Sequence, residues 1–232
     1  MTAAARVKLL AIDTTEETCS AALLIDDGVT ERFEFAPRRH SELILPMMDG
    51  LLAEAGLRLH DLDALAFARG PGSFTGVRIA ASVIQGAAFG AGLPVVPVSS
   101  LQALAQGAWR EGGETAVLAA LDARMHEVYW GAFRLGEADT MRALGAEAVC
   151  APHDVTVPTG ADWFGAGSGW KTYGETLGAR CVEAPRMHPG AFVHAQDVAT
   201  VAAVLLAEGA AVPAEQALPV YLRDEVAWAK QV

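Results

Sequence analysis

The stretch Ala64-Leu-Ala-Phe-Ala-Arg-Gly-Pro-Gly-Ser-Phe-Thr-Gly-Val-Arg78 decides how this chain folds. Its first five residues are apolar and predict a buried strand, which Gly70-Pro-Gly72 cannot continue. Ser73 and Thr75 are residue types that cap helices, and they precede an apolar, alanine-rich segment that continues to Phe89. The stretch therefore predicts a strand, a glycine-rich corner and the start of a long helix. Such a corner either holds an anion at the positive end of the helix or is a closely packed turn.

Around this stretch, the first half of the chain alternates between strands and helices. Two apolar runs, at 7–12 and 19–25, and a segment at 29–35 that alternates polar and apolar residues come first; joined by short turns, they predict antiparallel strands. Ser41 can cap a helix that ends at Gly56, and Pro46 is compatible with that helix in its first turn. A strand at 95–98 and a helix at 101–109 complete the order βββαβαβα. That order predicts a mixed sheet covered by helices, as in the ribonuclease-H-like fold that actin and Hsp70 ATPases use in pairs.

A second lobe is predicted after the boundary at Glu111-Gly-Gly-Glu114. An apolar run at 115–121, Asp122, a short turn and a further strand repeat the pattern that ends in Asp13 near the N-terminus. Residues 1–110 are thus expected to form the first lobe, and residues 111–232 a second, degenerate lobe. The second half also predicts a helix at 195–208 and an extended tail from Leu218, which could pack back on the first lobe.

Composition excludes several classes of protein. The net charge of −11, from 17 basic and 28 acidic residues, argues against nucleic-acid binding by the chain alone. The local exception is a patch of Arg38, Arg39, Arg69 and Arg78, for which ordinary surface arginines are the alternative. The three widely spaced cysteines fit neither a disulfide framework nor a zinc ribbon. A signal sequence and an apolar run of about 18 residues are both missing, which predicts a cytoplasmic chain without membrane contact.

The candidate chemistry lies in two corners of the first lobe. Gly70, Gly72 and Gly76 do not have the spacing of a dinucleotide fingerprint, and the lysine of a P-loop is missing. Asp13-Thr-Thr15 could hold a hydrated metal or touch a phosphate, or could form an Asx turn. In a two-lobed ATPase the opposing groups would be Asp122 and Gly165-Ala-Gly-Ser-Gly169, but no hydroxyl residue follows Asp122.

Covalent and metal catalysis have no evident set of residues. No two histidines are three or four residues apart, as a metal pair on a helix would be. Neither Ser73 nor Ser168 stands in a Gly-x-Ser-x-Gly motif. By contrast, the segments 43–52 and 77–89 predict helices that are apolar or small on most sides. Such helices are buried either in the chain's own core or against a partner.

Several motifs resemble the TsaB (YeaZ) family, a subunit of the bacterial machinery that makes threonylcarbamoyladenosine in tRNA. The resemblance covers about residues 9–133, and its most specific part is Gly70-Pro-Gly-Ser-Phe-Thr-Gly-Val-Arg-Ile79. The other matching segments are Ala11-Ile-Asp-Thr-Thr15, Arg39-His-Ser-Glu42 with Leu45-Pro46, Val98-Ser-Ser-Leu101, and Leu121-Asp-Ala-Arg-Met125 with Glu127-Val-Tyr129.

The resemblance implies an α/β protein with two ribonuclease-H-like lobes, the actin-like ATPase fold, in which the second lobe is reduced. It also implies a degenerate nucleotide site with no cofactor, for which the candidate residues are Asp13, Thr14, Gly70, Gly72 and Ser73. The family's TsaD paralogue holds a metal with two histidines four residues apart. Here Ile44 follows His40 at that spacing, so no metal site and no catalytic residues are expected.

The implied function is that of a non-catalytic subunit that binds and stabilises a TsaD-like transferase. A TsaE-like ATPase would join the assembly, tRNA would be held only by the complex, and two copies could pair when the transferase is absent. The alternative function is a weak ATPase, or a peptidase that acts on the partner. The residues expected at the partner interface are Leu45, Met48, Leu52, Val77, Ala80, Ala81 and Ile84.

Overall fold

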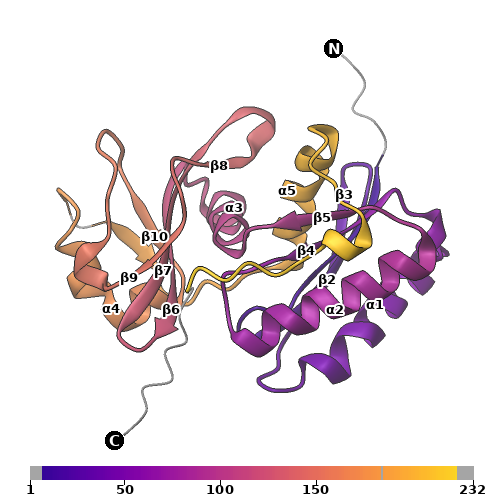
Figure 1. Cartoon of the computed structure of the whole chain (residues 1–232). Coiled ribbons are helices and arrows are strands. Elements are labelled where there is room, and N and C mark those ends of the chain that lie inside the picture. Colours follow the sequence, from indigo (N-terminus) through magenta and orange to yellow (C-terminus); the bar gives the residue numbers. More distant parts are fainter. Residues whose placement is uncertain (1–6, 184, 224–232) are drawn as a thin grey trace, which may run out of the picture.

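The apolar run near the N-terminus forms the centre of the first of two β-sheets (Figure 1). The computed structural model describes residues 7–183 and 185–223. The strand order in this sheet is β3-β2-β1-β4-β5. The β1 strand pairs antiparallel with β2 and parallel with β4, as predicted for three short-turn strands followed by crossover helices. The bounds are Lys8–Asp13 for β1, Thr18–Ile25 for β2, Gly28–Phe35 for β3, Ala64–Ala68 for β4 and Val95–Val98 for β5.

Helices cover both faces of this sheet. The helices α1 (His40–Ala55) and α2 (Phe74–Ala91) pack on one face, and α5 (Ala195–Ala207) packs on the other (Figure 1). Alternate residues of β1 serve the two faces, since Leu10 lies in the cluster with α1 and α2, while Leu9 lies in the cluster with α5. The first lobe is therefore completed by a helix from the second half of the chain.

The second sheet repeats the centre of the first. Its order is β11-β10-β6-β7-β8, with β9 also pairing with β7. Like β1, β6 has one antiparallel neighbour, β7, and one parallel neighbour, β10. The remaining strands have three residues each, so this lobe is the smaller copy. The bounds are Ala116–Arg124 for β6, Glu127–Leu135 for β7, Met141–Ala143 for β8, Ala148–Cys150 for β9, Phe164–Ala166 for β10 and Arg186–His188 for β11.

The helix α3 (Ser100–Gly112) lies between the two sheets (Figure 1). It contacts α5 of the first lobe and β6, β7 and β8 of the second. One continuous apolar cluster accordingly includes Leu9, Leu104 and Phe133, which come from β1, α3 and β7. A separate cluster on the far face of the second sheet contains Trp130 of that sheet and Trp170 of α4 (Ser168–Gly178), which packs on it. The two lobes thus share a core.

The C-terminal part of the described chain crosses from one lobe to the other (Figure 1). The side-chain amide nitrogen Nε2 of Gln85 on α2 donates to the Ala217 carbonyl, and Val220 N–H donates to the Arg69 carbonyl. Arg223 then reaches Glu127 and the Ala123 carbonyl in the second lobe. The predicted extended tail is described as far as residue 223, and residues 224–232 lie outside the described part.

Two local predictions about α1 are wrong. The helix begins at His40 with Arg39 at the cap position, so Ser41 is inside the helix and does not cap it. Pro46 is consequently in the helix interior rather than its first turn, where it removes one backbone hydrogen bond. The predicted end is confirmed, because Gly56 has φ of 66°, in the left-handed region that favours glycine. No helix in the described part of the chain is long and apolar enough to cross a membrane.

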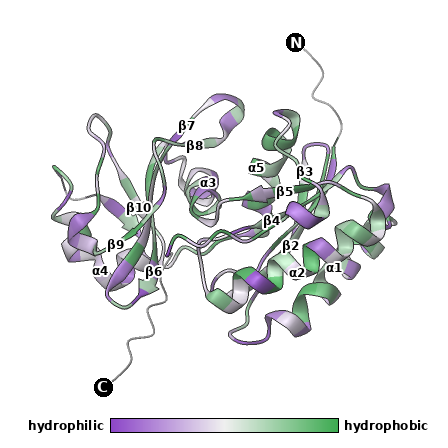
Figure 2. Ribbon diagram, in the orientation of Figure 1, coloured by the Kyte–Doolittle hydropathy of each residue, from purple (hydrophilic) through white to green (hydrophobic). Residues whose placement is uncertain are grey.

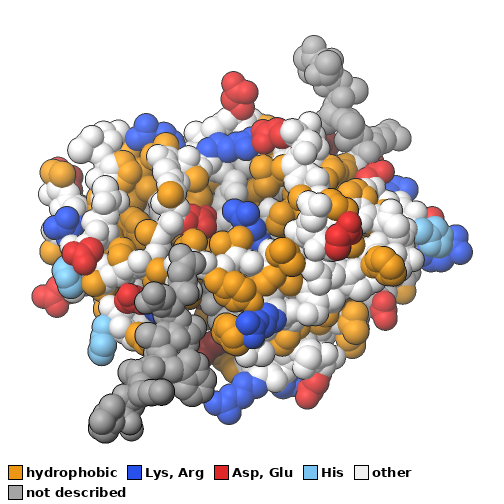
Figure 3. All heavy atoms as spheres, viewed as in Figure 1, with side chains coloured by type: hydrophobic (Ala, Val, Ile, Leu, Met, Phe, Trp, Pro, Cys, Tyr) orange, Lys and Arg blue, Asp and Glu red, His pale blue; other side chains and the backbone are white. Residues whose placement is uncertain are grey.

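Hydropathy and charge are distributed differently in the interior and on the surface. The strands β1 and β4 at the centre of the first sheet are apolar and buried, whereas hydrophilic and hydrophobic residues alternate in other elements (Figure 2). On the face shown in Figure 3, acidic and basic side chains are interspersed with hydrophobic ones. Arg39 is paired with Glu34 at 2.8 Å, and Arg78 donates to the Tyr221 hydroxyl at 2.8 Å. These arginines are thus engaged locally, as ordinary surface arginines are.

Candidate functional site

The glycine corner packs directly against the loop that follows β1. Thr14 Oγ1 donates to the Gly76 carbonyl at 2.7 Å, and Ser73 N–H donates to the Thr15 carbonyl at 2.7 Å. A Cβ atom at Gly76 would lie 2.0 Å from the Thr14 carbonyl oxygen, and one at Gly72 would lie 2.6 Å from that of Thr15. Backbone therefore fills the space between the two predicted halves of the nucleotide site.

The predicted site residues of the corner have structural partners. Ser73 Oγ accepts a hydrogen bond from Gly76 N–H at 3.0 Å and so caps α2, as its residue type predicts. Gly70 has φ of 103°, and a Cβ there would lie 2.9 Å from the Val220 carbonyl oxygen. The corner is therefore a packed junction between β4, α2 and the C-terminal segment.

Two carboxyl side chains lie where the lobes meet: Asp13 at the end of β1, and Glu16 in the loop that follows. Burial raises the pKa of Asp13 to about 7, although hydrogen bonds from the Thr15 hydroxyl and N–H oppose the rise. Its Oδ2 has no hydrogen-bond partner among the described residues. Burial and then the charge of Asp13 raise the pKa of Glu16 to about 8. Both shifts favour the protonated, neutral form of these carboxyl groups at the junction.

Glu16 is a residue of this junction that the sequence analysis missed. Its Oε1 accepts a hydrogen bond from Ser168 Oγ, and its Oε2 accepts one from Val193 N–H, both at 3.2 Å. Asp122, the predicted opposing acid, instead bonds to its neighbour, since Arg124 N–H donates to its Oδ1 at 2.8 Å. The sequence pointed to Glu16 only through its place directly after the Asp13-Thr-Thr15 corner. Its hydrogen-bond partners are far away in the sequence, so no local pattern connects them with Glu16.

His40 and Ile44 stand where the resemblance places the two metal-binding histidines of TsaD, and both have roles in the packing of this chain. His40 is buried, and its Nε2 lies 2.9 Å from the Glu16 carbonyl oxygen, where it can donate a hydrogen bond. Ile44, one helical turn further on, is fully buried in the core. Within residues 7–183 and 185–223, no three His, Cys, Asp or Glu side chains are grouped as metal ligands would be.

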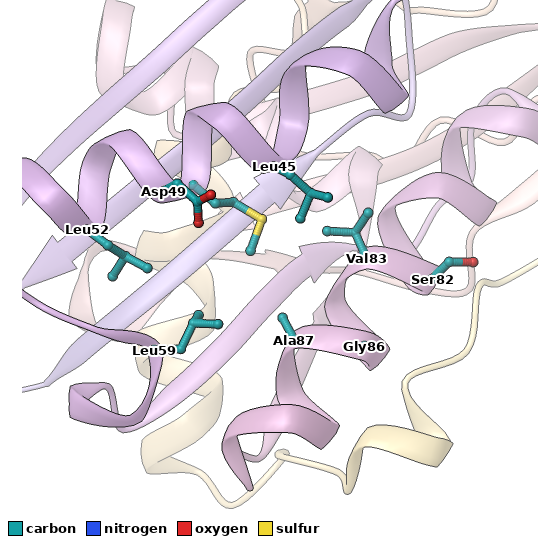
Figure 4. A pocket seen from close by; sticks show the side chains of 9 residues that line it. Leu45, Asp49, Leu52, Leu59, Ser82, Val83, Gly86 and Ala87 are labelled. Carbon is teal, nitrogen blue, oxygen red and sulfur yellow. The ribbon is translucent and has the colours of Figure 1, made fainter.

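A groove of about 430 Å³ runs between α1 and α2 and is lined mainly by apolar side chains (Figure 4). Leu45 of α1 points toward Val83 of α2 across its mouth, and Leu59 borders it below Leu52 (Figure 4). Gly86 lies on its α2 side, and a Cβ at Gly86 would meet no atom within 4 Å. Its lining residues are Leu45, Met48, Asp49, Leu52, Leu59, Ser82, Val83, Gly86 and Ala87.

The predicted interface residues separate into two groups. Leu45 is 50% exposed at the groove, and Met48 and Leu52 line it although they are largely buried. The other group, Val77, Ala80, Ala81 and Ile84, is buried in the chain's own core and lies outside the groove. These four side chains are buried in the chain itself, and their place at a partner interface stays a prediction. The groove residues of α2 are instead Ser82, Val83, Gly86 and Ala87.

A second hollow of about 460 Å³ continues the groove toward the start of α2. It shares Ser82 and Val83 with the first hollow. At its end, the Arg78 guanidinium carbon lies 3.4 Å from the centroid of the Phe74 ring, and Tyr221 lies beside both. Phe74 is 56% exposed. The groove is therefore an apolar surface with one cationic, aromatic end.

Comparison with known proteins identifies the family. The profile of the TsaD family, described as tRNA N6-adenosine threonylcarbamoyltransferase, matches residues 34–231. The tRNA threonylcarbamoyladenosine biosynthesis protein TsaB of Escherichia coli (strain K12) is 44% identical over 97% of this chain and 98% of that protein. The TsaB protein of Haemophilus influenzae is 41% identical over 96% of each chain.

A solved structure agrees with both the fold and the family. YeaZ from Pseudomonas aeruginosa superimposes with a TM-score of 0.88 and 49% identity, covering 93% of this chain and all of that one. The predicted fold of two ribonuclease-H-like lobes is confirmed by this similarity and by the two sheets. With full-length identity above 40% to two TsaB proteins, the chain belongs to the TsaB family and has the family's actin-like fold.

Proposed function

We propose that this chain is a non-catalytic subunit of the machinery that makes threonylcarbamoyladenosine in tRNA, and that it binds and stabilises a TsaD-like transferase. The observation that carries the proposal is the apolar groove between α1 and α2. Leu45, Val83 and Gly86 present apolar or small surface there, in a chain whose net charge is −11. Apolar surface left uncovered between two helices is the kind of surface that protein–protein interaction sites use.

The shape of the groove favours a helix as the docking element. Ser82, Gly86 and Gly90 are four residues apart, so they lie on one side of α2 and leave its backbone accessible. Small residues on one helix allow a second helix to pack close to its backbone. Leu45 and Val83 then supply the apolar edges of the contact. A second copy of this chain can occupy the same groove when the transferase is absent.

The packing of the corner supports the non-catalytic part of the proposal over an ATPase. Gly72 and Gly76 are closed against the Thr14–Thr15 backbone, and the buried carboxyl groups of Asp13 and Glu16 occupy the junction. The serines that a peptidase would need have structural roles, since Ser73 caps α2 and Ser168 bonds to Glu16. In this proposal the TsaE-like ATPase and the tRNA bind through the assembled complex, in the cytoplasm.

Co-purification with a TsaD-like transferase tests the proposal. Leu45→Arg places a charge at the exposed edge of the groove, and we expect it to abolish co-purification. Ala53→Arg is the matched control, because Ala53 is an exposed residue of α1 outside the groove, and it should leave binding unchanged. Equal recovery of the transferase by both variants would refute docking at this groove.

A further inference from the structure

A single carboxylate connects the two lobes at the point where their loops meet. Glu16 belongs to the loop after β1 in the first lobe. Its Oε1 accepts a hydrogen bond from the hydroxyl of Ser168, the first residue of α4 in the second lobe. Its Oε2 accepts Val193 N–H, just before α5. One half-buried side chain therefore bonds to two segments that lie more than 150 residues away in the sequence.

The partners of Glu16 are themselves held firmly. Ser168 Oγ accepts Asp122 N–H at 3.2 Å while its own proton goes to Glu16, so the end of β6 joins the same network. Gly167 has φ of 104°, and a Cβ there would lie 2.5 Å from the Ala120 carbonyl oxygen. The backbone around Ser168 is thus packed on β6. Its hydroxyl has little freedom to follow a displaced carboxylate.

The backbone of Glu16 is fixed from the other side. Its carbonyl oxygen lies 2.9 Å from His40 Nε2, at the first residue of α1. Glu16 is therefore held between α1, which borders the partner groove, and α4 of the second lobe.

We propose that Glu16 is the lock between the lobes: its carboxylate holds them closed without any bound ligand and excludes a phosphate-bearing ligand from the junction. The same donors, Ser168 Oγ–H and Val193 N–H, are those that an external anion would use there, and Glu16 occupies both.

Hydrogen exchange on the full chain tests the lock. In Glu16→Ala we expect the Val193 amide and the first turn of α4 to exchange about ten-fold faster than in wild type, as the loss of a buried hydrogen bond predicts. Glu17→Ala is the matched control, because Glu17 is the exposed neighbour, and its exchange should equal that of wild type. Unchanged exchange in Glu16→Ala would overturn the proposal.

Chemical rescue separates a missing carboxylate from general damage. Sodium acetate should slow the exchange of Glu16→Ala toward the wild-type rate, while sodium chloride at the same ionic strength should not. Inorganic pyrophosphate should raise the melting temperature of Glu16→Ala and leave that of wild type unchanged. Acetate and chloride acting alike, or pyrophosphate stabilising wild type equally, would overturn the proposal. If Glu16→Ala does not fold, Glu16→Gln keeps the side-chain volume but only one acceptor oxygen, so it should lose one of the two hydrogen bonds and show faster exchange at Val193 or in the first turn of α4, but not at both.

Discussion

Replacing Gly76 by alanine tests whether the glycine corner is a packed junction. The new Cβ would lie 2.0 Å from the Thr14 carbonyl oxygen and 2.6 Å from Ser73 Oγ, far inside normal contact distance. The carbonyl belongs to backbone that is buried between β1 and α2, so relief requires the loop or the helix to shift by about 1 Å or more. Such a shift breaks the bond from Thr14 Oγ1 to the Gly76 carbonyl.

The expected magnitude combines two opposing terms. Overpacking a buried site costs about 1–3 kcal/mol, and the lost hydrogen bond adds about 1 kcal/mol. Alanine is favoured over glycine inside a helix by up to about 1 kcal/mol, which offsets part of that cost. We therefore expect Gly76→Ala to lower the free energy of unfolding by about 1–3 kcal/mol. In a chain of this size, this corresponds to a fall in melting temperature of several degrees.

Gly86→Ala is the matched control on the same helix. A Cβ at Gly86 would meet no atom within 4 Å, so only the helix preference remains. This variant should be more stable than wild type by up to about 1 kcal/mol. Urea denaturation of both variants, followed by circular dichroism, measures the two changes. If Gly76→Ala were as stable as wild type, or if both variants changed stability in the same direction, the packed-junction interpretation would be refuted.

Two further predictions concern buried charges. Because Glu16 keeps its proton to a pKa of about 8 when folded, the folded chain binds more protons than the unfolded chain between about pH 4 and 8. Its stability should therefore fall as pH rises through this range, and urea titrations at several pH values should show a smaller fall for Glu16→Gln. Arg110→Ala leaves the buried carboxylate of Asp197 without its 2.8 Å ion pair. Thermal unfolding should show a loss of about 3 kcal/mol, whereas Glu111→Ala beside it should cost little.

The order of elements in the first lobe could be predicted from local signals. Glycine and proline mark the corners, and Ser73 caps α2 as its residue type predicts. The start of α1 could not be predicted in this way, because His40 is held by the Glu16 backbone and brings the helix start forward. Ser41 is therefore inside the helix although it is a good capping residue. Tertiary contact decided this position over local propensity.

The sequence indicated α1 and α2 as interface helices, but it did not indicate the groove between them. Apolar residues on most sides of a helix indicate burial, but they do not tell the face on the sheet from the face on the surface. On α2, Ile84 packs in the core cluster under the helix, whereas Gly86 borders the groove. The groove is open at Gly86 because this residue has no side chain, and a hydropathy pattern does not detect such an opening.

The junction between the lobes was beyond sequence reasoning. Glu16 meets Ser168 and Val193 only because the two sheets share a core around α3. No pattern in the sequence links residues that far apart. The division of the chain into lobes at residue 110 remains a prediction. The helix α5 follows that boundary in the sequence but packs on the first sheet.

The most direct test of the central claim is the affinity of Gly86→Arg for a TsaD-like transferase, measured by isothermal titration calorimetry. Arginine fits the open surface at Gly86 and favours the helix, so this variant should be at least as stable as wild type. Its long charged side chain would occupy the space that a docked helix needs, and we expect binding to weaken by about 100-fold or more. A stable Gly86→Arg protein that binds the transferase with wild-type affinity would contradict docking at the groove between α1 and α2.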